Sequence, residues 1–200
     1  MNRIVLATRN KHKTEEIKTI LRGLGLEILT LSDFPDVPVL KEEGSTFQEN
    51  SLQKAHTVHL HTRITALADD SGLEVFFLNG RPGVISARYA GDGATDEENN
   101  EKLLEQMRGV APRRRRAQFR AVLTFFGDNG TKVAEGICPG RLAESPRGTN
   151  GFGYDPIFIP DGFSRTYAEL TSEEKNTISH RAKALEKMRE ILRRGMGVAA

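Results

Sequence analysis

The opening of the chain alternates strand-like and helix-like segments, and this alternation constrains the fold more than any other feature. Residues 3–8 (Arg-Ile-Val-Leu-Ala-Thr) form a short apolar run typical of a buried strand. Residues 11–22 then carry apolar side chains at helical spacing and end at Gly23, before a second apolar run at 26–31. Parallel neighbouring strands need a crossover helix of this kind, so the sequence predicts a βαβ unit and an α/β fold.

Capping boxes mark the starts of three later helices. In each box a Thr is followed three residues later by a Glu, and the two side chains accept hydrogen bonds from free N–H groups of the helix start. The boxes begin at Thr46, Thr95 and Thr171 and predict helices that run to about 61, 107 and 192. The apolar stripe of the last segment, at Ile178, Ala182, Leu185, Met188 and Leu192, predicts a single helix packed on a sheet.

The remaining apolar runs predict further strands. Runs at 64–68 and 73–78 flank the polar segment Asp69-Asp70-Ser71-Gly72, which we interpret as a sharp corner between two buried elements. Strands at about 118–126 and 132–138 flank the hairpin signal Asp128-Asn129-Gly130. Strands, helices and a hairpin in this order predict a mixed sheet, and 200 residues fit a single domain.

Composition excludes several classes of protein. No apolar run approaches the roughly 18 residues of a membrane-spanning helix, and the start of the chain lacks the features of a secretory signal, so we expect a cytoplasmic protein with no membrane partner. The single cysteine, Cys138, excludes an internal disulfide and a cysteine-based zinc cluster. A net charge of +2 gives no general attraction to nucleic acid, and the basic run at 113–116 lacks interleaved aromatic residues, so we expect no nucleic-acid partner.

A first candidate site lies between the first strand and the first helix. A helix N-terminus offers free N–H groups and a positive dipole end, and polar side chains beside it add the donors that a phosphate chain requires. The alternative is a simple helix cap. The candidate binding residues are Thr8, Arg9, Asn10, Lys11, His12 and Lys13.

The polar corner is a second candidate site. Two adjacent acids at the end of a buried strand are costly to desolvate unless a cation or a set of donors receives them, so Mg²⁺ is a reasonable partner for the pair Asp69 and Asp70. Glu42 or Glu43, from the loop before the second helix, can supply a second carboxylate. The alternative is a turn with a capping Asp and a solvated neighbour.

A third candidate is the glycine-rich segment 148–156. Its glycines allow close approach of a ligand, Phe152 and Tyr154 offer faces for a planar base, and Asp155 offers an acceptor for a ring N–H. A tight glycine corner with two core aromatics is the alternative. The fourth candidate, at the start of the last helix, comprises Lys175, Ser179, His180 and Arg181, whose alternative is an ordinary solvated helix surface.

Taken together, six segments resemble the non-canonical purine nucleoside triphosphate pyrophosphatases, the dITP/XTP (inosine triphosphate) pyrophosphatase family. The resemblance covers nearly the whole chain. Its segments are Thr8-x-Asn10-x-x-Lys13; Glu42-x-Gly44-x-Thr46-Phe47-x-Glu49-Asn50; Ala68-Asp69-Asp70-Ser71-Gly72-Leu73; Pro82-Gly83-x-x-Ser86-Ala87-Arg88-Tyr89; Gly151-Phe152-Gly153-Tyr154-Asp155-Pro156-Ile157-Phe158; and Glu169-Leu170-x-x-x-Glu174-Lys175-x-x-x-Ser179-His180-Arg181.

The resemblance implies a fold, an activity and an assembly. It implies an elongated central mixed sheet whose flanking helices form two lobes around a substrate cleft, in one two-lobed domain over 1–200, and a homodimer. It implies Mg²⁺-dependent hydrolysis of ITP, XTP and dITP to the monophosphate and pyrophosphate, which keeps these nucleotides out of DNA and RNA.

The resemblance also implies roles for individual residues. Asp70 would be the catalytic acid and a metal ligand, with Glu42 as second carboxylate, Glu43 as its alternative and Ser71 at the substrate. Residues 8–13, chiefly Thr8, Asn10 and Lys13, together with Lys175 would hold the triphosphate. The base and its surroundings would be contacted by Phe152, Gly153, Tyr154, Asp155, His180 and Arg181.

Two alternatives of other classes remain at this point. One is an enzyme of similar architecture that acts on modified pyrimidine nucleotides, and a panel of substrates separates it. The other is a non-catalytic nucleic-acid module that uses the arginines at 113–116, for which a steep salt dependence of binding is the discriminating observation.

Overall fold

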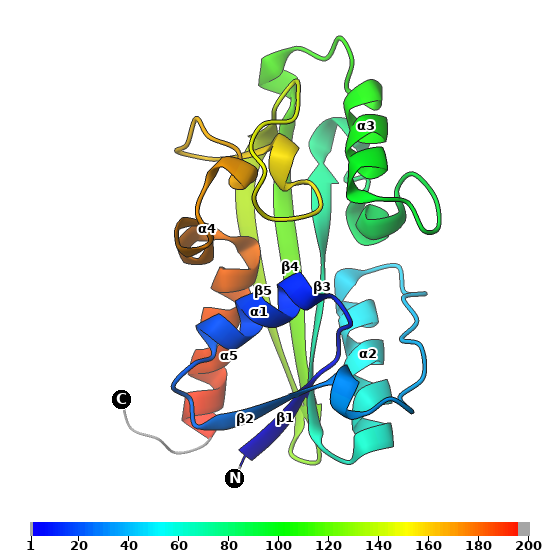
Figure 1. Ribbon diagram of the computed structural model, residues 1–200, viewed down its shortest axis with the longest axis vertical. Helices are drawn as coiled ribbons and strands as arrows, with labels where there is room; N and C mark the ends of the chain where they lie inside the picture. The colour runs from blue at the N-terminus through cyan, green and yellow to red at the C-terminus, as the bar shows by residue number, and fades with distance from the viewer. Residues whose placement is uncertain (1, 196–200) are drawn as a thin grey trace. The chain divides into compact units, whose positions relative to one another are not determined.

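The computed structural model describes residues 2–195 and contains both α-helices and β-strands (Figure 1). The strands are β1 (Asn2–Leu6), β2 (Leu26–Thr30), β3 (Thr65–Val75), β4 (Arg116–Gly127), β5 (Gly130–Leu142) and β6 (Phe158–Pro160). The α-helices are α1 (Lys11–Ile20), α2 (Phe47–Thr62), α3 (Asp96–Gln106), α4 (Ser172–Ile178) and α5 (His180–Gly195).

The described strands form one six-stranded sheet in the order β2-β1-β3-β4-β5-β6. β1 pairs in parallel with both β2 and β3, which confirms the βαβ unit, whereas β5 pairs antiparallel with β6. β4 and β5 are joined by two residues only, which requires a hairpin, and Gly130 at its end has a positive φ of 95°. The sheet is therefore mixed, as predicted.

The chain divides into two compact units. Unit 1 comprises residues 2–70, 121–136 and 181–195, and unit 2 comprises residues 71–120 and 137–180. The long strands β3, β4 and β5 each contribute residues to both units. The prediction of a single two-lobed domain stays a prediction.

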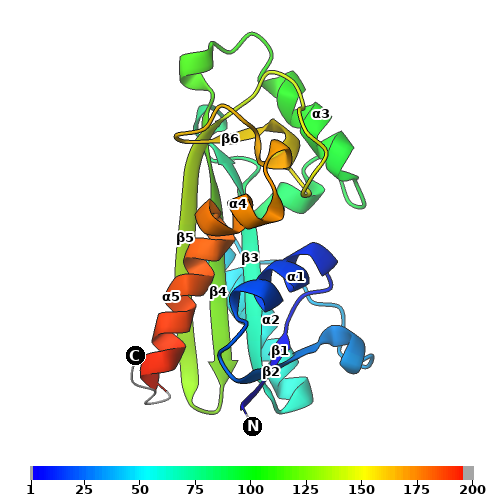
Figure 2. The same cartoon turned by 60° about the vertical axis from the view of Figure 1, so that its left-hand side comes forward.

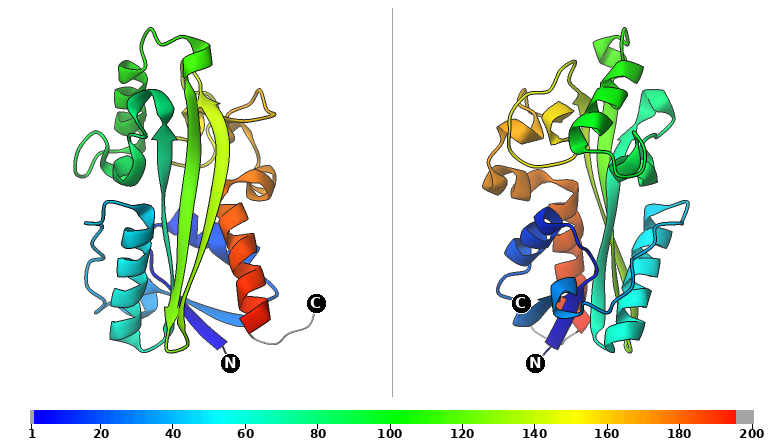
Figure 3. Two further views of the ribbon diagram at one scale, coloured as in Figure 1. Left: turned by 180° about the vertical axis from the view of Figure 1, so that it is seen from behind. Right: turned by 45° about the vertical axis from the view of Figure 1, so that its right-hand side comes forward.

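In unit 1, helices cover both faces of the sheet. The right-hand view of Figure 3 shows α2 on one face and α1 with α5 on the other, and Figure 2 shows α5 alongside β5. The strand residues alternate accordingly: Leu67 packs in the core beneath α1 and α5, whereas Ala66 and Ala68 pack in the core beneath α2. Both faces of β3 are thus buried within this unit.

Unit 2 is built around one apolar cluster. Leu73 of β3, Phe119 of β4 and Leu142 of β5 pack there with Leu103 of α3 and with Met107, which follows α3 directly. The aromatic residues of the segment after β5 complete the cluster, which also contains Tyr154, Phe158 and Tyr167. The side chain of Tyr154 therefore helps to anchor the glycine-rich segment in the core of unit 2.

Two sequence-based predictions about the elements are wrong. Asp69-Asp70-Ser71-Gly72 is no corner, because β3 runs through it without interruption. The last helix is not continuous, because Ser179 has extended backbone angles (φ −67°, ψ 157°) and separates α4 from α5. Over the described residues, every helix is too short or too polar to cross a membrane.

Candidate active site

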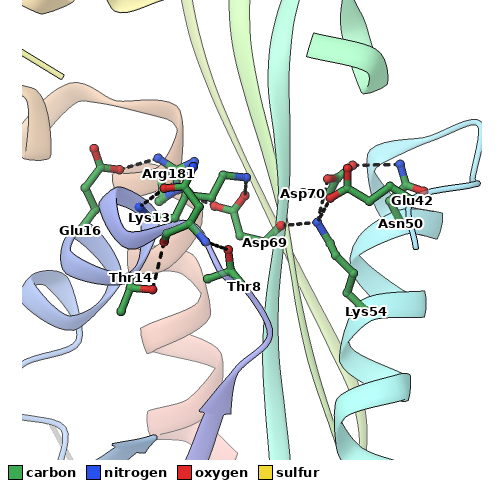
Figure 4. A network of polar contacts seen from close by, with 11 residues as sticks. Thr8, Lys13, Thr14, Glu16, Glu42, Asn50, Lys54, Asp69, Asp70 and Arg181 are labelled. Atoms are coloured by element: carbon green, nitrogen blue, oxygen red, sulfur yellow. Dashed lines mark hydrogen bonds and ion pairs between the residues drawn. The ribbon is translucent and has the colours of Figure 1, made fainter. Parts of the chain in front are cut away.

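The two acids of β3 point to opposite faces of the sheet. Successive side chains of a strand alternate in direction, so Asp69 lies on the face of Leu67 and Asp70 on the face of Ala68. Asp69 is 1% exposed and Asp70 is 4% exposed. Buried carboxylates require partners, and each acid obtains a different set (Figure 4).

Asp70 contacts two polar side chains of α2, Lys54 and Asn50, and Lys54 links it to Glu42. Nζ of Lys54 donates to Oδ1 of Asp70 at 2.9 Å and to Oε1 of Glu42 at 2.6 Å. Its third hydrogen bond goes to the backbone oxygen of Asp69 at 2.8 Å. Nδ2 of Asn50 donates to Oδ2 of Asp70 at 3.1 Å, so both carboxylate oxygens of Asp70 are held.

Helix α2 brings these groups together because Asn50 and Lys54 are four residues apart and share its buried face. The Thr46 capping box fixes where the helix starts, with Oγ1 of Thr46 accepting from the N–H of Glu49 at 3.1 Å. Oδ1 of Asn50 also accepts from the N–H of Gly44 at 2.7 Å, which ties the preceding loop to the site. That loop carries Glu42.

The environment shifts the pKa values of Asp70 and Glu42 in opposite directions. Burial raises the pKa of Asp70, and the nearby charge of Glu42 adds to this, so that the attraction of Lys54 does not bring it back to the ordinary value. Burial also acts to raise the pKa of Glu42, but the ammonium of Lys54 more than offsets it, so the pKa of Glu42 is lowered. Such a pair favours an ionised Glu42 beside an Asp70 able to take up a proton.

This donor set suits Mg²⁺. Mg²⁺ in proteins takes one or two carboxylates and completes its shell with water and phosphate oxygens. Glu42 and Asp70 contact the same ammonium and supply two carboxylates, whereas Glu43 is exposed and pairs with Lys41 at 3.3 Å. Among residues 2–195, no three His, Cys, Asp or Glu side chains gather to hold a metal, as a zinc site would require.

Asp69 belongs to an ion network on the opposite face. Nε of Arg181 lies 2.5 Å from Oδ2 of Asp69, and Nζ of Lys13 lies 3.0 Å from its Oδ1. Arg181 also pairs with Glu16. Burial acts to raise the pKa of Asp69, but the two cations outweigh it and hold that pKa far below its ordinary value.

The turn between β1 and α1 forms a helix cap. Oδ1 of Asn10 accepts from the N–H of Lys13 at 3.1 Å, and Oγ1 of Thr8 accepts from the N–H of Asn10 at 3.1 Å. Arg9 donates to the backbone oxygen of Val37, and Lys11 and His12 are exposed. Capping does not exclude phosphate binding, since the helix start remains at the surface with Lys13 beside it.

The glycine after Ser71 has a different role from the predicted one. A Cβ on Gly72 would lie 2.4 Å from the backbone oxygen of Gly83 and 2.4 Å from Oγ of Ser86. Gly72 therefore allows two segments of unit 2 to touch and does not serve a sharp turn. Ser71 is half-buried on the same strand.

In unit 2, the glycine-rich segment folds around Asp155. Oδ2 of Asp155 accepts from the N–H of Phe152 at 3.0 Å and from Nζ of Lys175 at 2.6 Å. The same ammonium lies 4.7 Å from the centroid of the half-buried Phe152 ring, a cation–π contact. Lys175 is thus grouped with predicted base-contacting residues of its own unit.

Two other predicted base contacts are core residues. Tyr154 is 4% exposed and its hydroxyl donates to the backbone oxygen of Ser86 at 2.9 Å, so its ring offers no free stacking face. His180 is buried and stacked on Phe119, with ring centroids 4.7 Å apart. Its neighbour Arg181 belongs to unit 1, where it pairs with Asp69 and Glu16.

The sequence reasoning missed Lys54 as a functional residue and assigned no role to Asn50. Their signal was present: two polar residues at helical spacing on the same face as the apolar Phe47, Ala55 and Val58. A Lys on the buried face of a helix needs an acid partner.

The basic run before β4 is divided among separate contacts. The guanidinium of Arg114 lies over the ring of Phe77 at 4.6 Å, and Arg115 is buried with three backbone oxygens as acceptors. Arg116 pairs with both carboxylate oxygens of Asp161, at 2.6 and 2.9 Å. The run is therefore not a continuous basic surface of the kind that binds nucleic acid.

A cavity of about 1090 Å³ in unit 2 contains none of the predicted site residues. It is lined by α3 and the segment that leads into β4, including Leu104, Met107 and Pro112. We assign the chemistry to the polar clusters, because they hold the buried charges and shifted pKa values that functional sites require.

The fold and these clusters define an α/β protein with a buried carboxylate pair beside a lysine. A family model described as the Ham1 family matches residues 4–191, and the chain belongs to that family. A relative named dITP/XTP pyrophosphatase from Geobacter sulfurreducens is 48% identical over 193 residues, which covers 96% of this chain and 97% of the relative. A relative of the same name from Elusimicrobium minutum is 49% identical and covers 93% and 97%.

Solved structures of similar proteins support the same family assignment. A HAM1 protein from Coxiella burnetii is 43% identical with a TM-score of 0.89, and the match covers 97% of this chain and 100% of that one. The Ham1 protein of Staphylococcus aureus is 41% identical with a TM-score of 0.87, covering 96% and 99%. The family resemblance seen in the sequence motifs is thereby confirmed.

Proposed function

We propose that this protein hydrolyses non-canonical purine nucleoside triphosphates, namely ITP, XTP and dITP, to the monophosphate and pyrophosphate. The observation that carries the proposal is the carboxylate pair of Asp70 and Glu42, bridged by Lys54, in a chain whose relatives are named dITP/XTP pyrophosphatases. The pair provides one acid with a raised pKa and one with a lowered pKa. An acid with a raised pKa suits water activation, and an ionised carboxylate suits the binding of a metal ion that neutralises phosphate charge.

In this proposal Asp70 accepts the proton of the attacking water, since a base with a raised pKa works closer to neutral pH. Glu42 and Asp70 would hold Mg²⁺, which supplies charge neutralisation to the phosphate oxygens when bound. Lys54 fixes the position of both carboxylates and partly neutralises them. Hydrolysis needs little covalent chemistry from the protein, so positioning of these groups supplies most of the catalysis.

We assign the two ends of the substrate to different clusters. Lys13 and the start of α1 would take the triphosphate, where an ammonium lies beside the positive end of the helix dipole. Phe152 would stack on the base, and Lys175 and Asp155 beside it would supply a donor and an acceptor. This assignment moves Lys175 from the triphosphate to the base, because its contacts are with Asp155 and Phe152.

The protein can discriminate hypoxanthine and xanthine from adenine because the wrong base would leave a buried polar group of the site without a hydrogen-bond partner. Hypoxanthine and xanthine carry O6 and an N1–H where adenine carries an amino group and a bare N1. A buried donor directed at O6 would lose its partner with adenine, at a cost of about 1–3 kcal/mol. Mg²⁺ as cofactor, a homodimeric assembly and a cytoplasmic location complete the proposal and are supported by the resemblance to the family.

The test is an assay of pyrophosphate release from ITP, XTP, dITP, GTP and ATP, with and without Mg²⁺. We expect Mg²⁺-dependent turnover of the first three and a loss of at least about 10²-fold in Asp70→Asn, the usual size of general-base catalysis. Glu42→Gln should raise the Mg²⁺ concentration needed for half-maximal rate, whereas the matched control Glu43→Gln should not. Equal turnover of ITP and ATP, or a preference for pyrimidine nucleotides, would overturn the proposal.

A further inference from the structure

Helix α3 holds the glycine-rich segment through two hydrogen bonds to Gly153. Oδ2 of Asp96, in the first turn of α3, accepts from the N–H of Gly153 at 2.6 Å. Nδ2 of Asn100, one turn further along, donates to the backbone oxygen of Gly153 at 2.8 Å. The peptide groups on both sides of this glycine are therefore bonded to one helix.

The orientation of Asn100 is determined by its partners. Its Nδ2 donates also to the backbone oxygen of Asp96 at 2.7 Å, so the amide nitrogen faces two carbonyl oxygens. A flipped amide would direct its oxygen at both of them, which excludes that orientation. Asn100 is 5% exposed, so the bond to Gly153 is shielded from water.

The neighbouring residue Asn99 holds a different segment. Its Oδ1 accepts from the N–H of Ala90 at 2.7 Å, and its Nδ2 donates to the backbone oxygen of Ala87 at 3.3 Å. Asn99 is 2% exposed. Each of the two adjacent asparagines of α3 is therefore hydrogen-bonded to the backbone of a different segment, Asn99 to residues 87–90 and Asn100 to Gly153.

The position of Phe152 depends on these bonds. Gly153 has a φ of 61°, in the left-handed region, and as a glycine it has many other backbone conformations available. Asp155 holds the N–H of Phe152 from one side and α3 holds Gly153 from the other. With the α3 contacts removed, the backbone beside the Phe152 ring would be free to rotate, and a stacked ligand would have to order it again at an entropic cost.

We propose that Asp96 and Asn100 are positioning residues that preorganise Phe152 and Asp155 for the purine base. Neither residue was predicted to be part of the site, and neither need contact the substrate. The inference rests on the proposed function, because it concerns the base end of that substrate. It predicts that α3 controls affinity for the base and leaves affinity for the phosphates unchanged.

The experiment compares Asp96→Ala with Glu97→Ala. Both variants remove one acid from the first turn of the same helix, so both lose the same type of favourable interaction with the helix dipole, but only Asp96 bonds to Gly153. Calorimetry with IMP, which has the base, and with inorganic tripolyphosphate, which lacks it, separates the two ends of the substrate. Steady-state pyrophosphate release from ITP supplies KM and kcat.

We expect Asp96→Ala to weaken IMP binding and raise the KM for ITP by about tenfold, the equivalent of one hydrogen bond to an ionised group. Tripolyphosphate binding should not change, and Glu97→Ala should match the parent in every measurement. Asn100→Ala should repeat the pattern of Asp96→Ala. Asn99→Ala, with a similar loss of buried hydrogen bonds, should lower thermal stability without the selective loss of IMP affinity.

The outcomes distinguish failure of the proposed function from failure of this inference alone. If the parent releases no pyrophosphate from ITP, the proposed function fails and this inference fails with it. If the parent is active but Asp96→Ala and Glu97→Ala are alike, or if Asp96→Ala weakens tripolyphosphate as much as IMP, the inference alone is wrong. If Asn99→Ala weakens IMP as much as Asn100→Ala, α3 acts only through general stability and the inference is again wrong.

Discussion

Asp69 and Asp70 are adjacent, yet we expect Asp69→Asn to affect mainly stability and Asp70→Asn to affect mainly turnover. Asp69→Asn should lower stability, because it removes the carboxylate that neutralises the buried Arg181 and Lys13. Asp70→Asn should abolish turnover and should lower stability less than Asp69→Asn does, because Lys54 keeps its pair with Glu42. Burial disfavours the ionised form of Asp70, as its raised pKa indicates, so a neutral amide there relieves a cost.

The size of the Asp69 effect follows from its partners. Breaking a buried ion pair by removing one partner costs about 3–5 kcal/mol. Arg181 keeps its pair with Glu16, so we expect the lower part of this range, about 3–4 kcal/mol. In a chain of 200 residues each kcal/mol lowers Tm by about 2–4 °C, which gives a fall of about 6–16 °C.

The pH dependence has a definite sign. The pKa of Asp69 is lowered in the folded chain, so its contribution to stability is fully present above its ordinary value of 3.8 and is lost as the pH falls through the folded pKa. The difference in stability between the parent and Asp69→Asn should therefore be largest near pH 7 and shrink below about pH 4.

The assay is urea unfolding followed by circular dichroism at pH 7 and pH 3.5, with pyrophosphate release from ITP measured on the same preparations. Three results would refute the reasoning. They are an unfolding free energy for Asp69→Asn within about 1 kcal/mol of the parent at pH 7, a difference that grows on acidification, or equal destabilisation by Asp70→Asn.

The other predictions concern the substrate ends and the glycine-rich segment. Lys13→Ala should weaken tripolyphosphate binding more than IMP binding, and Lys175→Ala should weaken IMP binding more than tripolyphosphate binding. Calorimetry with both probes tests this, and equal weakening of both probes in each variant would contradict the assignment. Gly151→Ala should destabilise the protein by about 1–3 kcal/mol in urea unfolding, because its Cβ would lie 2.0 Å from Oδ2 of Asp155 at a φ of 77°. An unchanged unfolding midpoint for Gly151→Ala would show that the segment tolerates the displacement of Asp155.

Local chemistry explains what could be predicted from the sequence. The three predicted capping boxes, at Thr46, Thr95 and Thr171, are all present, because each depends on residues within one helical turn. The β4–β5 hairpin follows from Asn129-Gly130, which suits a tight turn, and the βαβ opening follows from periodicity. These features need no information from distant parts of the chain.

The path of the chain through Asp69 and Asp70 could not be predicted in the same way. The two adjacent acids predicted a corner, because burying charged side chains in a strand that is covered on both faces costs free energy. They are tolerated there because Lys13 and Arg181, 56 and 112 positions away along the chain, lie against Asp69, and Lys54 of α2 lies against Asp70. No local pattern reports such partners.

The sequence by itself therefore determined the fold class, the starts of the predicted helices and the family, since these depend on short-range spacing and on motifs in order. Only the tertiary structure decided that Asp70 faces Lys54 and Glu42 while Asp69 is neutralised on the other face. It also decided that Tyr154 is core and that Lys175 belongs with Asp155. The physical reason is that a buried polar side chain is defined by its partners, and long-range packing brings those partners to it.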